Sequence, residues 1–202
     1  MLSYSLTHNE TEDEEVGYAL ALATNPSCAF VIISVGMGLY NSYFYGICLY
    51  ISIIISTIIS GIIFKPKTQF ISFPHDKARQ RFSISDSIKA SSHTCLYICA
   101  FIVFFSVLIE LIENHLPITV FSEILLSFFE IGNGAVRLSA LKLNYAIPLT
   151  AMMLGSTGLC AYVQVRAFVP DCISMKKYIF MKLTEAIFSF LLCTIIMSIA
   201  LK

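Results

Sequence analysis

The chain has 202 residues, of which 57% are hydrophobic and only 13% are charged. Soluble domains carry about twice that share of charge, so there are too few charges to cover a water-facing surface, and the composition excludes a soluble globular domain. Basic and acidic side chains balance at 13 each, which gives no argument for a nucleic-acid partner. The composition therefore predicts an all-α, polytopic membrane bundle whose first partner is the lipid bilayer.

The chain begins with an acidic, polar stretch, residues 1–15, which we expect to form a tail. It lacks the positive start and apolar core of a signal peptide. The next segment, Val16 to Tyr40, is apolar but interrupted at Asn25-Pro26-Ser27. We expect it to form a hairpin that enters and leaves the membrane on one side, so that residues 16–64 comprise a re-entrant hairpin and a transmembrane helix.

The clearest predicted membrane span runs from Tyr43 to Phe64 without a charge, close to the roughly 20 residues that a helix needs to cross hydrocarbon. Residues 65–93 follow as a predicted basic loop, which the positive-inside rule places in the cytoplasm. This loop contains six basic side chains: Lys65, Lys67, Lys77, Arg79, Arg81 and Lys89. Residues 94–202 form the rest of a single membrane domain, with continuous spans expected at Thr94–Ile112 and Tyr178–Leu201.

Two more apolar segments of this domain are interrupted. Phe121–Leu143 is broken at Gly132-Asn133-Gly134, and Tyr145–Val169 at Gly155-Ser156-Thr157-Gly158. Lipid cannot solvate a broken backbone, so such breaks are expected only inside protein or beside a polar cavity. Transporters use half-helix ends of this kind to hold a solute near the membrane midplane.

Counting sides from the basic loop predicts how these segments cross. Val16–Tyr40 would be a hairpin from outside and Tyr145–Val169 a hairpin from inside. Phe121–Leu143 would be a broken crossing, with Arg137 and Lys142 toward the cytoplasm. Arg166, Lys176 and Lys177 then lie on the same side as the basic loop.

Glu130 is the first candidate site residue, because a carboxylate between Phe129 and Ile131 would be costly if it faced lipid. It could bind a cation, a proton or a hydroxyl group. The alternatives are an ion pair with Arg137 or a position among lipid headgroups. Three amides, Asn25, Asn133 and Gln164, can donate to and accept from a polar solute. Each could instead satisfy the backbone groups freed by its own break.

Other polar residues favour structural roles. Lys182 and Glu185 are spaced to meet on one helix face, which favours a structural pair. Cys95, Cys99 and His93 could share a helix face, but buried cysteines are more often small hydrophobic residues than ligands. No catalytic motif, metal site or cofactor site is recognisable, so we expect neither an enzyme nor a metalloprotein.

Four stretches resemble the sporulation integral membrane proteins of the YlbJ type, which carry nucleoside-recognition, or gate, domains. TNPSCAF at Thr24–Phe30 is similar to that family's Thr-Asn-x-Ser-Pro-x-Phe, and GLCAYVQV at Gly158–Val165 to its Gly-Leu-Ser-Val-His-x-Gln-Val. IVFFSVLIEL at Ile102–Leu111 and FFEIGNGAVRL at Phe128–Leu138 resemble two further family stretches. The residues that the resemblance carries over are Asn25, Ser27, Glu130, Gly134, Gly158 and Gln164.

The resemblance implies a gate-like protein of a bacterial inner or forespore membrane, active in sporulation. It implies a small polar solute, nucleoside-like, as ligand. The expected solute site comprises Asn25, Ser27, Glu130, Asn133, Gly134, Gly158 and Gln164. Family members are about twice as long, so the chain resembles a carboxy-terminal half that pairs with itself or with a second membrane half. The alternatives are a structural or assembly protein of the spore envelope and a truncated, inactive relic.

Overall fold

The computed structural model describes residues 10–66, 84–117, 119–141, 143–170 and 173–200. Within these ranges the chain is helical and has no strand. The elements are α1 (Glu10–Ala23), the π-helix η1 (Phe30–Leu39), α2 (Tyr43–Ile63), α3 (Ile84–Glu113), α4 (Val120–Ser127), α5 (Ile131–Ala140), α6 (Ala146–Ser156), α7 (Gly158–Phe168) and α8 (Lys176–Ala200). This confirms the predicted all-α bundle with broken helices.

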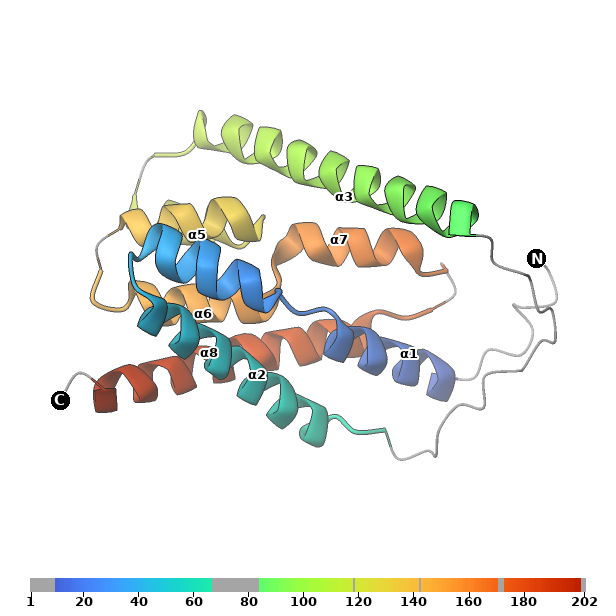
Figure 1. Cartoon of the computed structure of the whole chain (residues 1–202), viewed down its shortest axis with the longest axis horizontal. Coiled ribbons are helices and arrows are strands. Elements are labelled where there is room, and N and C mark those ends of the chain that lie inside the picture. The colour runs from blue at the N-terminus through green and yellow to red at the C-terminus, as the bar shows by residue number, and fades with distance from the viewer. Residues whose placement is uncertain (1–9, 67–83, 118, 142, 171–172, 201–202) are drawn as a thin grey trace.

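The helices run back and forth between two ends of an elongated bundle (Figure 1). At one end, called the basic end, α2 and α7 finish and α1, α3 and α8 begin; Lys65, Arg166 and Lys176 lie there. At the opposite, acidic end α3 finishes and α4 begins, next to Glu113. Four segments are long and apolar enough to cross a membrane: Tyr43–Ile63, Ile84–Glu113, Ala146–Phe168 and Lys176–Ala200.

The predicted hairpins are placed differently by the structure. α1 and η1 continue in one direction through the bundle, and so do α6 and α7 (Figure 1), so neither segment is a hairpin. Instead α4 and α5 pack against each other and return to the acidic end. The direction was mispredicted because a break leaves the next helix free to continue or to reverse, and the packing surfaces that decide this lie elsewhere in the chain.

Two predicted boundaries also shift. Helix α1 begins at Glu10, so residues 10–15 are helical rather than part of a polar tail. Helix α3 begins at Ile84 rather than Thr94, so residues 84–93 extend the helix and do not belong to the basic loop. The remainder of that loop, residues 67–83, lies outside the described residues. The span predicted at Tyr43–Phe64 is confirmed as α2, and the last span as α8.

Local chemistry explains two of the breaks. Pro26 has no N–H and disfavours a helical conformation at Asn25, and regular helix stops at Ala23. Between α6 and α7 the chain turns through Thr157 and Gly158, whose φ angles are +62° and +73°. This is the left-handed region, which glycine adopts freely and a β-branched residue does not.

Small side chains allow the central helices to approach closely. Helix α2 places Ser52, Ser56 and Ser60 on the buried face that it turns toward α8. The hydroxyls of Ser56 and Ser189 are 2.6 Å apart, and Ser60 donates to the carbonyl of Met181. Small polar residues at such contacts are the usual way to join helices in a membrane. Helix α8 is thereby held against α2, and it also packs against α6 and α1.

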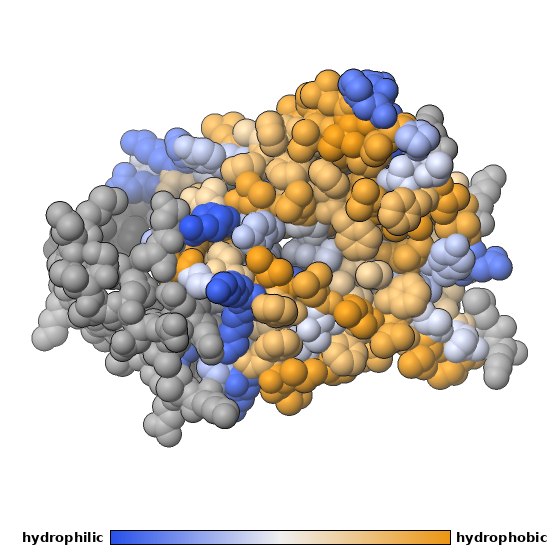
Figure 2. Space-filling view, turned by 180° about the vertical axis from the view of Figure 1, so that it is seen from behind, coloured by the Kyte–Doolittle hydropathy of each residue, from blue (hydrophilic) through white to orange (hydrophobic). Residues whose placement is uncertain are grey.

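The outer surface is apolar. Orange, hydrophobic atoms cover most of the face seen in Figure 2, and hydrophilic atoms gather toward its two ends. Large side chains such as Ile62, Val103 and Phe180 are more than half exposed. Together with the four long apolar helices, this surface identifies a membrane-embedded protein, because soluble proteins rarely expose an apolar patch of this extent to water.

Candidate functional site

A buried ion pair lies in α8, the central helix of the bundle. Nζ of Lys182 is 2.8 Å from Oε2 of Glu185, and the two residues are 4% and 0% exposed. At about 1.5 Å per residue, Glu185 lies about 14 Å into a helix about 37 Å long, which is its middle third. The predicted pairing of these two residues is therefore confirmed, and it occurs deep within the bundle.

The ammonium group also contacts the break between α1 and η1. It donates to the carbonyl oxygen of Thr24 at 2.5 Å and to Oδ1 of Asn25 at 3.2 Å. The Thr24 carbonyl is available because the helix stops there, which leaves it without a helical partner, and the amide side chain of Asn25 supplies the second acceptor. The hydroxyl of Thr57 in α2 completes the group. It lies 3.3 Å from Oδ1 of Asn25 and 3.5 Å from Oε2 of Glu185, and its shortest hydrogen bond is to the carbonyl of Ile53 at 3.0 Å. Asn25, a predicted site residue, thus lies among four polar groups from three elements.

A pocket of about 300 Å³ lies beside this cluster. Its wall is formed by the tip of the α4–α5 hairpin, where α4 ends, by the break between α6 and α7 with the start of α7, and by α8. The lining residues are Phe128, Ser156, Gly158, Leu159, Tyr162, Tyr178, Ile179, Lys182 and Leu183. Gly158 was predicted as a site residue from the sequence. Lys182 joins the pocket to the buried ion pair, because its side chain belongs to both.

The tip of the α4–α5 hairpin binds the start of α7. The amides of Leu159 and Cys160 donate to the carbonyls of Phe128 and Phe129, each at 2.8 Å. A helix start has free N–H groups and the tip has free carbonyls, so each satisfies the other. This contact brings the second and third breaks of the chain together at the pocket, as expected for interruptions buried in protein.

Glu130 caps α5. Its carboxylate accepts hydrogen bonds from the amides of Gly132 at 2.9 Å and Asn133 at 2.7 Å. The break therefore lies at Phe128–Glu130, and the predicted break at Gly132-Asn133-Gly134 is wrong: those residues form the first turn of α5. A carboxylate at a helix start is stabilised by the free N–H groups and the helix dipole.

Asn133 fixes the same tip to α3. Its Nδ2 donates to Oγ of Ser106 at 2.9 Å and to Oε2 of Glu130 at 3.1 Å. Both hydrogen-bond partners of this amide are protein groups. This agrees with the alternative that Asn133 stabilises its own helix interruption and does not bind a solute.

Arg137 does not pair with Glu130, so that alternative is wrong. Its guanidinium contacts Glu113 of α3 at 2.5 Å and Glu123 of α4 at 2.8 Å. The group lies at the acidic end of the bundle, away from Lys65 and Lys176, which contradicts the prediction that Arg137 shares a side with the basic loop. The ion pairs join three helices at the place where the hairpin begins.

The remaining predicted site residues lie apart from the pocket wall. Ser27 is exposed, and its hydroxyl accepts from the amide of Phe30. Gly134 is buried where α5 touches the backbone of α4 at Ser127. Gln164 donates from Nε2 to Sγ of Cys160 at 3.2 Å. These three residues shape the elements around the site.

Sequence reasoning missed several groups of the site. The charges of Lys182 and Glu185 within an apolar run gave a signal, but the pair was interpreted as structural. Thr57, Ser156 and Tyr178 gave none, because hydroxyls are common in such helices. Tyr178 is 1% exposed, and its hydroxyl lies near the side chains of Thr24 and Thr157 without forming a standard hydrogen bond to a described residue.

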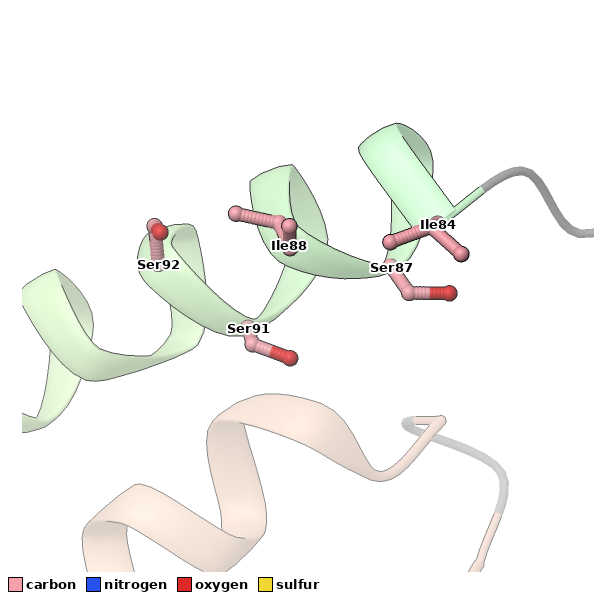
Figure 3. Close-up of a pocket in the computed structure, with 5 residues that line it drawn as sticks. All are labelled: Ile84, Ser87, Ile88, Ser91 and Ser92. Carbon is pink, nitrogen blue, oxygen red and sulfur yellow. The ribbon is translucent and has the colours of Figure 1, made fainter.

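A second hollow lies along the first turns of α3 and is lined by Ile84, Ser87, Ile88, Ser91 and Ser92. Ser87 and Ser91 point toward the neighbouring ribbon, whereas Ile88 and Ser92 point away from it (Figure 3). The lining belongs to one helix and has no titratable group, so it offers a solute little to bind. Within the described ranges no three His, Cys, Asp or Glu residues group to hold a metal ion.

The chain matches no protein family, no curated protein and no solved structure in comparisons with each.

Proposed function

We propose that this chain is a multi-pass membrane protein that transports a small polar solute through the site around Lys182. The observation that carries the proposal is the buried Lys182–Glu185 pair, which shares Lys182 with a pocket of about 300 Å³. Charged side chains inside a membrane are costly and generally line solute or ion pathways. A purely structural contact between α8 and α2 is already available from serines.

The arrangement supports a transport mechanism in three parts. Lys182, Tyr178 and Ser156 would replace part of the hydration shell of a solute in the pocket. The hairpin tip and the start of α7 would form one wall of the pocket. Two backbone hydrogen bonds join these two parts, and breaking both would let them separate. The continuous helices α2 and α8 would form the fixed wall, held together by serine contacts. Movement of one wall against the other would expose the pocket alternately to the two sides.

The orientation follows from charge. We place the basic end in the cytoplasm, since basic residues are retained there. Lys65, Lys176 and Lys177 lie at this end, where α2 finishes and α8 begins. The acidic end would then face outward, and the α4–α5 hairpin would enter from outside.

The YlbJ-type resemblance supports a nucleoside-like solute, a role in sporulation, and an inner or forespore membrane of a bacterium. It also supports an assembly in which this chain pairs with itself or with another membrane half. Both the solute class and the assembly are proposed from the four sequence stretches that resemble this family.

Counterflow into proteoliposomes tests the proposal. Vesicles with purified protein are loaded with unlabelled uridine, ribose, alanine or lactate, and entry of the same labelled solute is followed. At least one solute should accumulate transiently with wild-type protein. The double variant Lys182→Met with Glu185→Gln should reduce its rate at least tenfold, and Glu110→Gln, on the exposed side of α3, should leave it unchanged. Absence of counterflow for every solute, or equal rates for the double variant and wild type, would refute transport through this site.

A structural or assembly role is the second candidate, favoured by the way Glu130 and Asn133 are satisfied by protein groups. It predicts that no solute shows counterflow and that Glu130→Gln changes only the stability of the protein. Transport lost by Glu130→Gln in a protein that inserts and melts normally would instead place Glu130 in the solute pathway.

A further inference from the structure

The pocket wall beside Lys182 carries polar groups and no carboxylate. Its polar lining consists of the Lys182 ammonium and the hydroxyls of Ser156, Tyr162 and Tyr178. The ammonium donates to Thr24, Asn25 and Glu185. Ser156 donates to a backbone carbonyl, whereas the buried Tyr178 hydroxyl forms no standard hydrogen bond among the described residues. Leu159, Ile179 and Leu183 make much of the remaining wall apolar. Such a wall fits a small molecule with an apolar body and a negatively charged end.

The charge of this wall depends on Glu185. With the carboxylate ionised, Lys182 and Glu185 together are neutral. With Glu185 protonated, one positive charge remains beside the pocket. An uncompensated charge is costly inside a membrane, and an anion in the pocket would compensate it.

Glu185 has an oxygen available for a proton. Oε2 accepts from Lys182 and lies 3.5 Å from the Thr57 hydroxyl, whereas Oε1 is buried without a hydrogen-bond partner among the described residues. A proton on Oε1 would leave the contacts of Oε2 in place geometrically while removing the negative charge. The proton comes from water and remains on the glutamic acid.

We propose that the pocket binds a small monocarboxylate together with one proton, which resides on Glu185. A monocarboxylate takes the place of the nucleoside-like solute that the resemblance suggests, and its binding rests on the pocket of the proposed transporter. In it, the solute carboxylate replaces Asn25, the most distant acceptor of the Lys182 ammonium, and Tyr178 donates a hydrogen bond to the solute. Loading and unloading are electroneutral, because the solute and the proton enter the site together.

Few other titratable groups face Glu185. On α8 they are Lys182 and Tyr178. Helix α6 carries no titratable side chain. From α2 the facing group is the Thr57 hydroxyl, and from the α1 side it is Asn25. The nearby tyrosines are Tyr18 of α1 and Tyr162 of α7. Proton uptake with the ligand is therefore assigned to Glu185.

Three probes of similar shape test the charge preference: benzoate, benzamide and benzylammonium. Their binding to the full chain in detergent is measured by titration calorimetry. Benzoate should bind at least tenfold more tightly than benzamide, and benzylammonium most weakly. Comparison of buffers with different ionisation enthalpies should show about one proton taken up per benzoate. In that regime the Kd should rise about tenfold per pH unit, since the bound state holds one more proton.

Variants assign the groups. Glu185→Gln imitates the protonated acid, so benzoate should bind without proton uptake and with little pH dependence. The double variant Lys182→Met with Glu185→Gln carries no unpaired charge and should fold, but should lose the preference for benzoate over benzamide. Tyr178→Phe should weaken benzoate binding about fivefold without lowering the Tm, because it removes an unpaired buried hydroxyl. A structural role for this hydroxyl predicts the reverse, a lower Tm with unchanged binding.

Several results would overturn the inference: no benzoate binding at millimolar concentration, equal affinity for benzamide, or binding without proton uptake by the wild type. The assay needs no transport. Benzoate binding with proton uptake, combined with failed counterflow, would refute the transport proposal and leave the ligand site standing. Counterflow of a neutral solute alone, with no benzoate binding, would support the transport proposal and refute the monocarboxylate site.

Discussion

Gly134 lies where α5 crosses the backbone of α4, and no larger side chain fits there. A Cβ atom would overlap the carbonyl oxygen of Ser127, which is backbone and cannot rotate away. We predict that Gly134→Ala lowers the free energy of unfolding by about 1–3 kcal/mol, the usual cost of overpacking. Thermal unfolding in detergent, followed by circular dichroism, measures this. Gly38→Ala is the matched control, since its nearest atom, the oxygen of Ile33, would be 3.5 Å away. Equal melting of the two variants would contradict the packing seen at Gly134.

Glu130 should show graded effects as its oxygens are removed. It accepts from two amides, and a glutamine retains one acceptor oxygen whereas an alanine retains none. We predict a Tm order of wild type above Glu130→Gln above Glu130→Ala, with about 0.5–2 kcal/mol lost in the alanine variant, as for other N-caps. Glu110→Gln serves as an exposed control. A Tm for Glu130→Ala that equals the wild type would rule out the cap.

The site residues were only partly predictable from the sequence. Asn25 and Gly158 were found because Pro26 and a Gly-Ser-Thr-Gly stretch mark breaks locally. The place of Lys182 in the site depended on a free carbonyl at Thr24, far away in the chain. Long-range contacts of this kind leave no periodic signal, so residues such as Tyr178 and Thr57 emerge only from the fold.

At the scale of elements, the turn between α6 and α7 contains an unfavourable residue. Thr157 has a φ angle of +62°, and Gly158 follows with a φ angle of +73°. A positive φ is costly for a β-branched side chain such as that of Thr157. We predict that Thr157→Gly is neutral or raises the Tm, because glycine adopts this region freely. Gly158→Ala should lower the Tm and weaken ligand binding, since its Cβ would also lie 3.3 Å from Ile131 and the Phe128 carbonyl. Thermal unfolding of both variants is the measurement. The opposite order would contradict the left-handed turn.

Continuous helices were predictable from hydrophobic length, as α2 and α8 show. The folding direction at breaks was not. The α4–α5 pair reverses because Gly134 permits direct backbone contact with α4, and because Arg137 ties the returning helix to Glu113 and Glu123. The π-helix η1 was also unpredicted. There Gly36 meets Gly46 of α2 so closely that neither position has room for a Cβ.

For the whole molecule, the fold makes a topological prediction that separates it from the arrangement expected from the sequence alone. Asn144, just before α6, lies at the acidic end and should face outside, whereas the earlier scheme placed this turn in the cytoplasm. In spheroplasts, an impermeant maleimide should label Asn144→Cys and Asn114→Cys without permeabilisation. Lys65→Cys should need permeabilisation. The parent chain reports the background from native cysteines. Labelling of Asn144→Cys only after permeabilisation, with Asn114→Cys labelled without it, would contradict the fold in the membrane.

The spacing of the ion pair has a consequence for biogenesis. Lys182 and Glu185 are three positions apart on one helix. The ion pair can therefore form within α8 before any other part of the chain packs against it. Helix α8 can therefore enter the bilayer with no net charge at this depth, and a helix with either residue alone would insert less efficiently. Asn25 and Thr57 then join a pair that already exists.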